Sequence, residues 1–173
     1  MQEKLVCRWA VSGDIDRIRK MYYDVIDHMP QTVYFDWEKG RWPSDEYLVS
    51  SIDCKELYIG ESGGEIVCAA ILNHEYNEGY DEAPWQIDAD ENDTLMVHTL
   101  AVSPYYHGKG ISVQFVRSII EAAREKNLRA VRLDIIVGNV AAGKLYEKCG
   151  FKFIQHFVSR VKIEEVYFFE YVL

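Results

Sequence analysis

The stretch VHTLAVSPYYHGKGIS runs from Val97 to Ser112 and has the pattern of a strand, a glycine turn and the start of a helix. Gly108 and Gly110 have no Cβ atom, so the backbone can fold closely around an anion at this turn. A helix that begins there presents unbonded N–H groups and the positive end of its dipole, and both favour a phosphate. The stretch therefore predicts either a phosphate-binding bend or a plain tight turn.

Two familiar phosphate loops do not fit this stretch. A dinucleotide-binding fingerprint needs a third glycine at position 113, where the chain has Val113. A Walker loop needs four residues between its glycines, followed by Lys and then Ser or Thr. The spacing of Gly108 and Gly110 meets neither requirement, so these two kinds of nucleotide loop are excluded.

A second motif lies further along the chain, where residues 139–151 read NVAAGKLYEKCGF. Asn139 is a good residue to cap a helix start, and Gly150 stands where a left-handed C-cap is expected. Apolar residues recur between them at helical spacing, at Ala142, Leu145, Tyr146 and Cys149. The simplest interpretation is a short helix in which Asn139 is only a cap and Tyr146 only a core aromatic residue.

Taken together, the two motifs resemble the GNAT superfamily of acyl-CoA-dependent N-acetyltransferases. The family pattern Gln/Arg-x-x-Gly-x-Gly/Ala corresponds to residues 105–110, and Asn-x-x-Ala-x-x-Leu-Tyr-x-x-x-Gly-Phe corresponds to residues 139–151. The chain departs from the pattern at Tyr105, in the usual Gln/Arg position, and at His107, where Arg or Gln often precedes the glycine. The resemblance is close over about residues 95–153 and extends to the N-terminal half only in the order of elements.

The resemblance implies an α/β (α+β) fold with a mixed, mostly antiparallel central sheet flanked by helices, and acetyl-CoA as the co-substrate. It implies that backbone groups of the strand bind the pantetheine arm like an added strand. It also implies that the bend binds the pyrophosphate, and that Lys109, Lys144 or Lys148 meets the 3′-phosphate unless each is an ordinary solvated lysine. The coenzyme-binding residues implied in this way are Leu100, Ala101, Val102, His107, Gly108, Lys109, Gly110, Ile111, Ser112, Asn139 and Tyr146.

The hydrophobic pattern of the whole chain predicts the element order β-α-α-β-β-β-α-β-α-β-β. Strands are expected near residues 4–9, 56–60, 65–74, 94–102, 130–136, 151–158 and 164–172, with one helix over residues 110–126 and a short helix over residues 139–148. Ser12 and Asp14 indicate the start of an amphipathic helix that carries Ile15, Ile18, Tyr22, Val25 and Ile26. Ser62-Gly63-Gly64 predicts a tight hairpin turn. Ser44 is expected to cap a short helix that ends near Ile52. The length of 173 residues predicts a single domain over residues 1–173.

Composition limits the classes of partner. The chain has 19 Lys and Arg against 28 Asp and Glu, and a net charge of −9 disfavours binding to nucleic acid. The longest apolar run covers residues 66–72, far short of the ~20 residues that span a bilayer, and no signal peptide is recognised. We therefore expect a cytoplasmic protein without membrane contact. The four cysteines lack metal-binding spacing, so no metal site is expected.

The predicted reaction needs a base, because an amine with a lysine-like pKa of ~10.4 is mostly protonated at neutral pH. The candidates are His98 and Glu75, together with Asp134, acting directly or through water; otherwise His98 is structural and Glu75 merely solvated. Strand alternation places His98 on the same face as Leu100, but a bulge would reset this count.

The other catalytic steps follow from the chemistry of a thioester. A backbone N–H near Thr99 or Leu100 would stabilise the oxyanion, an effect of ~3–4 kcal/mol per donor. The resemblance points the Tyr146 hydroxyl at the sulfur, where a general acid contributes ~10²–10⁴-fold. Cys149 is expected to be a buried structural thiol rather than an acyl carrier. We therefore expect direct transfer without a covalent enzyme intermediate.

The acceptor is less well defined than the coenzyme. Acidic residues crowd residues 75–93, and these could join the aromatic residues Tyr34, Trp37, Trp42 and Trp85 in a pocket for a cationic small-molecule or peptide amine. The alternative is a solvated loop with locally packed aromatic rings. Two other functions remain open, a non-catalytic acyl-CoA-binding module and a transferase for another acyl group. Residues 164–173 are expected to form either a sheet edge for a homodimer or an inner strand.

Overall fold

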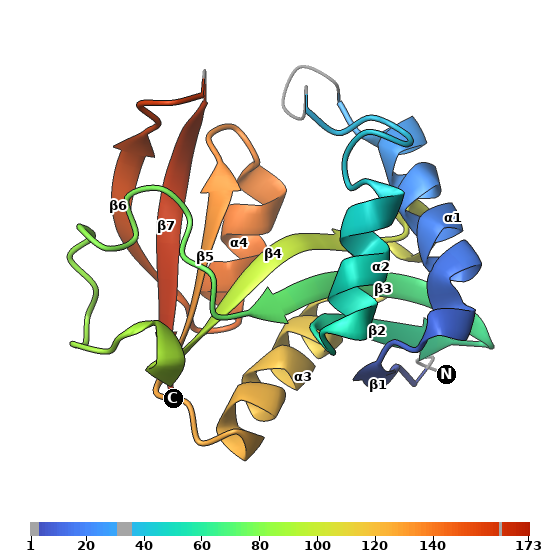
Figure 1. Ribbon diagram of the computed structural model, residues 1–173, viewed down its shortest axis with the longest axis horizontal. Coiled ribbons are helices and arrows are strands. Elements are labelled where there is room, and N and C mark those ends of the chain that lie inside the picture. Colours follow the sequence, from blue (N-terminus) through green and yellow to red (C-terminus); the bar gives the residue numbers. More distant parts are fainter. Residues whose placement is uncertain (1–3, 31–35, 163) are drawn as a thin grey trace. The chain divides into compact units, whose positions relative to one another are not determined.

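A computed structural model describes residues 4–30, 36–162 and 164–173 of the chain (Figure 1). The helices and strands follow the predicted order. The strands are β1 (Val6–Trp9), β2 (Leu57–Ser62), β3 (Glu65–Asn73), β4 (Thr94–Val102), β5 (Ala130–Ile136), β6 (Lys152–Val158) and β7 (Glu165–Val172). The helices are α1 (Ile15–His28), α2 (Asp45–Asp53), α3 (Ile111–Glu125) and α4 (Val140–Lys148).

Neighbouring strands are hydrogen-bonded in the order β1-β2-β3-β4-β5-β7-β6. β4 and β5 are parallel, whereas β1 with β2, β2 with β3, β5 with β7 and β6 with β7 are antiparallel. The predicted fold class, a mixed and mostly antiparallel sheet with helices, is therefore confirmed. Contacts divide the chain into two compact units, one with the residues up to Leu72 and His98–Phe115, the other with Asn73–Val97 and Val116–Leu173. The single domain over residues 1–173 stays a prediction.

In the first unit, α1 and α2 pack on β2 and β3. The two helices bury apolar side chains at helical spacing, and the strands contribute every second residue to the same core. Ser44 Oγ accepts a hydrogen bond from the Tyr47 N–H at 3.2 Å, which confirms the predicted cap of α2. The buried core residues of these elements are Ile18, Met21, Tyr22, Leu48, Ile52, Leu57, Ile59, Ile66, Ala69 and Ile71, and Ala101 of β4 belongs to the same cluster.

The other face of this unit receives the start of α3. The ring of Tyr58 on β2 stacks on Phe115 of α3, with ring centroids 5.8 Å apart. β2 and β3 are joined by the predicted hairpin, in which Gly63 and Gly64 have φ angles of +59° and +85°. These left-handed angles favour glycine, because a side chain at such a position is strained.

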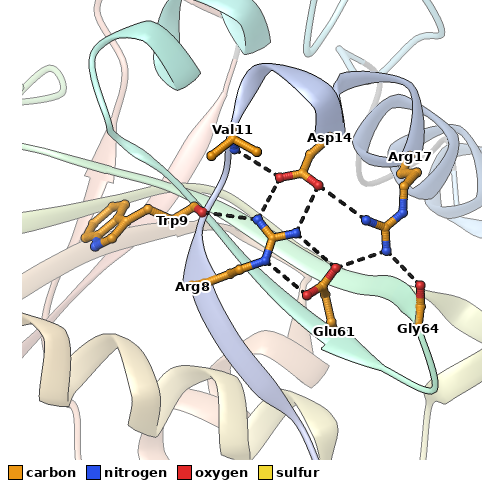
Figure 2. A network of polar contacts seen from close by, with 7 residues as sticks. All are labelled: Arg8, Trp9, Val11, Asp14, Arg17, Glu61 and Gly64. Atoms are coloured by element: carbon orange, nitrogen blue, oxygen red, sulfur yellow. Dashed lines mark hydrogen bonds and ion pairs between the residues drawn. The ribbon is translucent and has the colours of Figure 1, made fainter.

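A network of arginines and carboxylates ties β1, the start of α1 and β2 together in the first unit (Figure 2). The Arg8 guanidinium donates to both oxygens of Asp14, at 2.7 and 2.9 Å, and to Glu61 at 3.0 Å. Arg17 donates to the same two carboxylates and to the carbonyl oxygen of Gly64. Hydrogen bonds from Arg8 hold the pKa values of Asp14 and Glu61 below their usual range.

In the second unit, a buried arginine fixes the segment from 75 to 93, which we call the acidic loop. Arg132 on β5 is buried together with Glu170 on β7, and its Nε donates to that carboxylate at 2.9 Å. Its other nitrogens donate to the Tyr76 hydroxyl at 3.0 Å and to the carbonyl oxygens of Ala89 and Ile87 at 3.0 and 3.1 Å. The Arg132 guanidinium therefore anchors the acidic loop by donating to three of its residues, Tyr76, Ile87 and Ala89.

β7 is an inner strand. It pairs with β5 on one side and with β6 on the other. Pairing with a second copy through this backbone would need an unpaired edge, so the edge alternative for β7 is wrong and the inner-strand alternative is confirmed. A homodimer formed by another surface stays a prediction. Among the described residues, no helix is long and apolar enough to cross a membrane.

Candidate functional site

β4 contains an irregularity in its middle. Thr99 has a φ of +50°, which is a rare angle for a β-branched residue in a strand. The residues before it, Thr94–Val97, are buried, whereas His98, Thr99 and Leu100 are half-buried and Ala101 is buried again. The alternation that would place His98 and Leu100 on one face is therefore interrupted at Thr99.

The backbone of this irregular segment is held from α1. The Tyr22 hydroxyl donates a hydrogen bond to the Thr99 carbonyl oxygen at 2.9 Å. Tyr22 is only 1% exposed, and burial raises the pKa of its hydroxyl. In the described part of the chain, the buried Thr99 Oγ1 has no hydrogen-bond partner. No sequence motif marked Tyr22 as more than one of the apolar residues of its helix.

A bend follows β4 and leads into α3. After a short turn at Pro104–Tyr106, the chain passes through Gly108 and Gly110, whose φ angles are +76° and +77°. We call residues 107–110 the glycine bend. These two left-handed angles explain why glycine is needed at both positions. A Cβ atom at Gly108 would meet nothing within 4 Å, so the space beside this glycine is open.

The amide groups at the start of α3 are available to a ligand. The N–H of Gln114 donates to the Gly110 carbonyl oxygen at 3.2 Å, so the amides of Ile111, Ser112 and Val113 precede the first bond of the helix. By helix geometry these amides have no acceptor within the helix. Ile111 is buried, which leaves only its backbone for the predicted contact with the coenzyme.

The side chains of the glycine bend lie on the surface. His107 and Lys109 are exposed. The Nε2 of His107 lies 3.2 Å from the Val102 carbonyl oxygen, and the Lys109 ammonium lies 4.6 Å from the centre of the Tyr106 ring. The bend therefore brings one exposed cation next to the open backbone amides at the start of α3, a combination suited to an anion.

In the second unit, α4 begins with a cap. Asn139 Oδ1 accepts a hydrogen bond from the Ala142 N–H at 3.1 Å, so the plain capping role is confirmed. The side-chain NH₂ of Asn139 remains the group with which it would bind pantetheine. The φ of +97° at Gly150 confirms the predicted end of the helix.

Tyr146 lies on the buried side of α4. Its ring is 5% exposed, and its centroid lies 5.3 Å from that of Phe151 and 6.4 Å from that of Phe169. Cys149 is half-buried, and burial raises the pKa of its thiol, which lowers the fraction of nucleophilic thiolate. This favours the structural thiol over an acyl carrier. Lys144 and Lys148 are exposed.

The candidate bases of the second unit differ in their surroundings. Glu75 is exposed, and its N–H donates to the Asn73 Oδ1 at 3.0 Å. Asp134 is half-buried on β5, and its Oδ2 accepts hydrogen bonds from the Tyr80 hydroxyl at 2.8 Å and from Asn77 at 2.6 Å. Burial and this neighbouring carboxylate raise the pKa of Tyr80. No sequence pattern indicated these two donors, because both lie in a polar loop far from Asp134 in the chain.

The aromatic residues proposed for the acceptor have contacts within their own units. Trp37 is half-buried, with its ring centroid 5.9 Å from that of Tyr22. Trp85 stacks on Phe168 at 5.7 Å and lies 4.5 Å from the Arg132 guanidinium. These contacts account for packing, and the acceptor role of both residues stays a prediction. Trp42 stacks on Tyr47, and the predicted site residue Tyr34 lies outside the described residues.

A groove of about 420 Å³ lies beside the acidic loop, between Tyr76, Phe157 and Arg160. Two of the carboxylates that line it, those of Glu78 and Glu82, already have partners. Glu78 accepts hydrogen bonds from the Ser159 hydroxyl and the Arg160 N–H at 2.7 and 2.8 Å, and Glu82 lies 3.1 Å from the Arg160 guanidinium. Within residues 4–30, 36–162 and 164–173, no group of His, Cys, Asp and Glu is arranged to hold a metal ion.

Comparison with known proteins gives consistent results. The family model described as the acetyltransferase (GNAT) family matches residues 17–151. The uncharacterized N-acetyltransferase MJ1207 of Methanocaldococcus jannaschii is 28% identical over 153 residues, covering 84% of this chain and 59% of that protein. This chain therefore spans less than two thirds of the archaeal relative's length.

Solved structures with low sequence identity share the fold. A GNAT-family acetyltransferase from Streptococcus agalactiae superposes with a TM-score of 0.82 at 18% identity, over 98% of this chain and 95% of that one. The yncA protein of Salmonella typhimurium, solved with its cofactor acetyl-CoA, has a TM-score of 0.71 at 16% identity, over 98% and 94% of the two chains.

Proposed function

Because this chain belongs to the acetyltransferase (GNAT) family, we propose that it moves an acetyl group from acetyl-CoA to a primary amine of a small molecule or a peptide. The observation that carries this proposal is the glycine bend. Two left-handed glycines lead into α3, whose first amides, those of Ile111, Ser112 and Val113, have no acceptor within the helix, and a Cβ at Gly108 would meet nothing within 4 Å. A diphosphate fits such a group of donors, because it is anionic and accepts several hydrogen bonds.

Other residues would bind the rest of the coenzyme. The backbone of Leu100, Ala101 and Val102 would pair with the pantetheine arm in the manner of an added strand. The side-chain NH₂ of Asn139 would donate to the same arm, since its carbonyl oxygen caps α4. The Lys109 ammonium, which is exposed at the bend, is our candidate for the 3′-phosphate.

The reaction proceeds by direct attack of the amine on the thioester carbonyl carbon. A base first removes a proton from the ammonium form of the acceptor, and His98, Glu75 and Asp134 are the candidates. As the nitrogen–carbon bond forms, a backbone N–H of β4 stabilises the oxyanion. The carbon–sulfur bond then breaks, and Tyr146 gives its hydroxyl proton to the departing thiolate. The nitrogen loses its second proton to solvent as the amide forms, and Tyr146 regains a proton from solvent.

The cationic nature of the acceptor is proposed from the negative charge of the acidic loop. Exposed carboxylates of the acidic loop, including Glu75, Asp81 and Asp88, would attract a cationic amine over the surface of the chain. Trp37 and Trp85 are retained as candidate contacts for that amine. A small amine and the amino group of a peptide both fit this charge pattern.

The proposal is tested by calorimetry and by thiol release. We expect acetyl-CoA to bind at micromolar concentration and free thiol to form with at least one member of a panel of primary amines. No association at millimolar acetyl-CoA would contradict the proposal. Tight binding without thiol release for any amine would instead support a non-catalytic acyl-CoA-binding module.

Tyr146→Phe separates catalysis from binding. Loss of the general acid should lower kcat by ~10²-fold or more, because proton donation to the leaving group contributes ~10²–10⁴-fold. The Kd of acetyl-CoA should stay within about twofold of wild type, since the ring is retained. An unchanged kcat would remove Tyr146 from the mechanism while leaving the coenzyme site in place.

A further inference from the structure

One peptide unit of β4 is held by a side chain outside the predicted motifs. The Thr99 carbonyl oxygen accepts the 2.9 Å hydrogen bond from Tyr22, 77 residues earlier in the chain. The same planar peptide carries the N–H of Leu100, which is trans to that oxygen and points in the opposite direction. A hydrogen bond at one end of this unit therefore sets the direction of the donor at the other end.

The conformation of Thr99 needs such support. A φ of +50° costs a β-branched residue energy, and strained residues persist only where the surroundings enforce them. Thr99 provides no support of its own, because the buried Oγ1 has no hydrogen-bond partner in the described part of the chain. The contact from Tyr22 is thus a specific restraint on a strained segment.

Tyr22 is suited to this task. It belongs to the core of the first unit, with Ile18, Leu57 and Ala101, so its ring is fixed. It is 1% exposed, and burial raises the pKa of its hydroxyl, so the proton stays available for donation over the range of pH at which the protein is folded. A hydrogen bond accepted by the carbonyl oxygen also polarises the peptide and makes its N–H a stronger donor.

We propose that Tyr22 is a positioning residue, which holds the peptide between Thr99 and Leu100 so that the Leu100 N–H donates to the acyl oxygen of acetyl-CoA. The inference rests on the proposed function. To the oxyanion donation already expected from the β4 backbone, it adds a residue of α1 that touches neither substrate.

The first test compares two ligands that differ in the acyl group. Coenzyme A lacks the oxygen that the Leu100 N–H would bind, so Tyr22→Phe should weaken acetyl-CoA by about fivefold and leave coenzyme A within about twofold, in line with one lost hydrogen bond. The same variant should lower kcat by about tenfold or more, because oxyanion donors act mainly in the transition state, while the KM of the amine stays unchanged. Tyr23→Phe, on the same helix with its ring near the Lys39 ammonium, should behave as wild type.

Several results would overturn the inference. An unchanged kcat and an unchanged preference for acetyl-CoA in Tyr22→Phe would do so, as would an equal loss of affinity for both ligands, which indicates a general structural role. If the variant fails to fold, the contact between the Leu100 N–H and the acyl oxygen is tested by NMR on the wild-type protein. The Leu100 amide proton should move downfield with acetyl-CoA and not with coenzyme A, and equal shifts would refute the assignment. Failure of the proposed function is distinct, because wild type would then release no thiol.

Discussion

The glycine bend and the acidic loop were both candidates for ligand binding, but they differ in whether the backbone groups near them already have hydrogen-bond partners. The acidic loop is satisfied by its own unit. Arg132 donates to the Ala89 and Ile87 carbonyl oxygens, and the Gln86 N–H donates to Glu170 at 2.6 Å. The glycine bend leads into a helix whose first amides have no acceptor within the helix.

This difference shows that polar residue content alone does not identify a binding loop. A loop whose backbone groups already have partners has little to offer a ligand, whereas the open N–H groups at the start of α3, which follow two left-handed glycines, are suited to an anion. The acidic loop is therefore packed by its own unit, and any contribution to the acceptor is proposed to come from the charge of its exposed side chains. The glycine bend is proposed to act through the backbone that it leads into.

The largest expected effect removes the anchor of the acidic loop. Arg132→Met leaves the Glu170 carboxylate buried without its cation, and we expect the free energy of unfolding to fall by about 3–5 kcal/mol. Urea denaturation measures this change. Limited proteolysis should cut between residues 75 and 93 sooner than in wild type.

The double variant Arg132→Met with Glu170→Met is the control for the buried charge. It should recover part of the lost stability, because no unpaired ion is left in the core. Acetyl-CoA should bind both folded variants with the wild-type Kd. A loss below about 1 kcal/mol in the single variant would show that the loop has other anchors.

The next largest effect is expected from a substitution in the glycine bend. Gly110→Val places a β-branched residue at a φ of +77°, so the bend must rearrange and turn its amides away. We expect the Kd of acetyl-CoA to rise about 100-fold, equivalent to about 2.8 kcal/mol at 1.4 kcal/mol per factor of ten. Calorimetry at a temperature where the variant is folded measures this change.

Gly63→Val is the matched control. Gly63 has a φ of +59° in the turn between β2 and β3, and a Cβ there meets nothing within 4 Å. The two substitutions impose similar backbone strain, but only the first lies at the proposed anion site. Equal losses of affinity in both variants would mean that strain rather than the open amides determines binding.

The smallest effect concerns pH at the acidic loop. Hydrogen bonds from Ser159 and from the Arg160 N–H lower the pKa of Glu78 from its usual 4.5. A pKa that is lower in the folded state means that the ionised carboxylate helps to hold the loop above about pH 4.5, and that this contribution is lost as pH falls through the lower folded value. The amide shift of Arg160 should follow this titration by NMR, with a midpoint below 4.5. Glu78→Gln should abolish it, and a titration that persists in this variant would assign it to another group.

Local patterns predicted most of the elements because their causes are local. The repeating apolar residues of α3 and α4, the cap at Asn139 and the left-handed Gly150 depend on residues within a few positions of each other. The hairpin at Gly63 is of the same kind. The edge or inner position of β7 was not predictable, because it depends on which strand returns beside it after a long stretch of chain.

The contacts that position the site were harder to predict from the sequence. Tyr22 reads as a core residue of an amphipathic helix, and nothing in its neighbourhood indicates a hydrogen bond to Thr99. Arg132 gave a faint signal, a charge inside the apolar strand AVRLDII, but its partners Glu170 and Tyr76 lie 38 and 56 residues away. Distant pairs of this kind leave no periodic trace in a single sequence.

By itself, the sequence determined the order of the helices and strands, the glycine bend and the resemblance that led to a family. These properties arise from backbone preferences and from apolar periodicity, which act over a few residues. Only the tertiary structure decided that Thr99 takes a left-handed angle, that Tyr22 holds its carbonyl, and that the acidic loop is anchored by a buried arginine. Such features depend on which groups meet when the chain closes on itself, since a buried polar group must find its partner wherever the fold brings one.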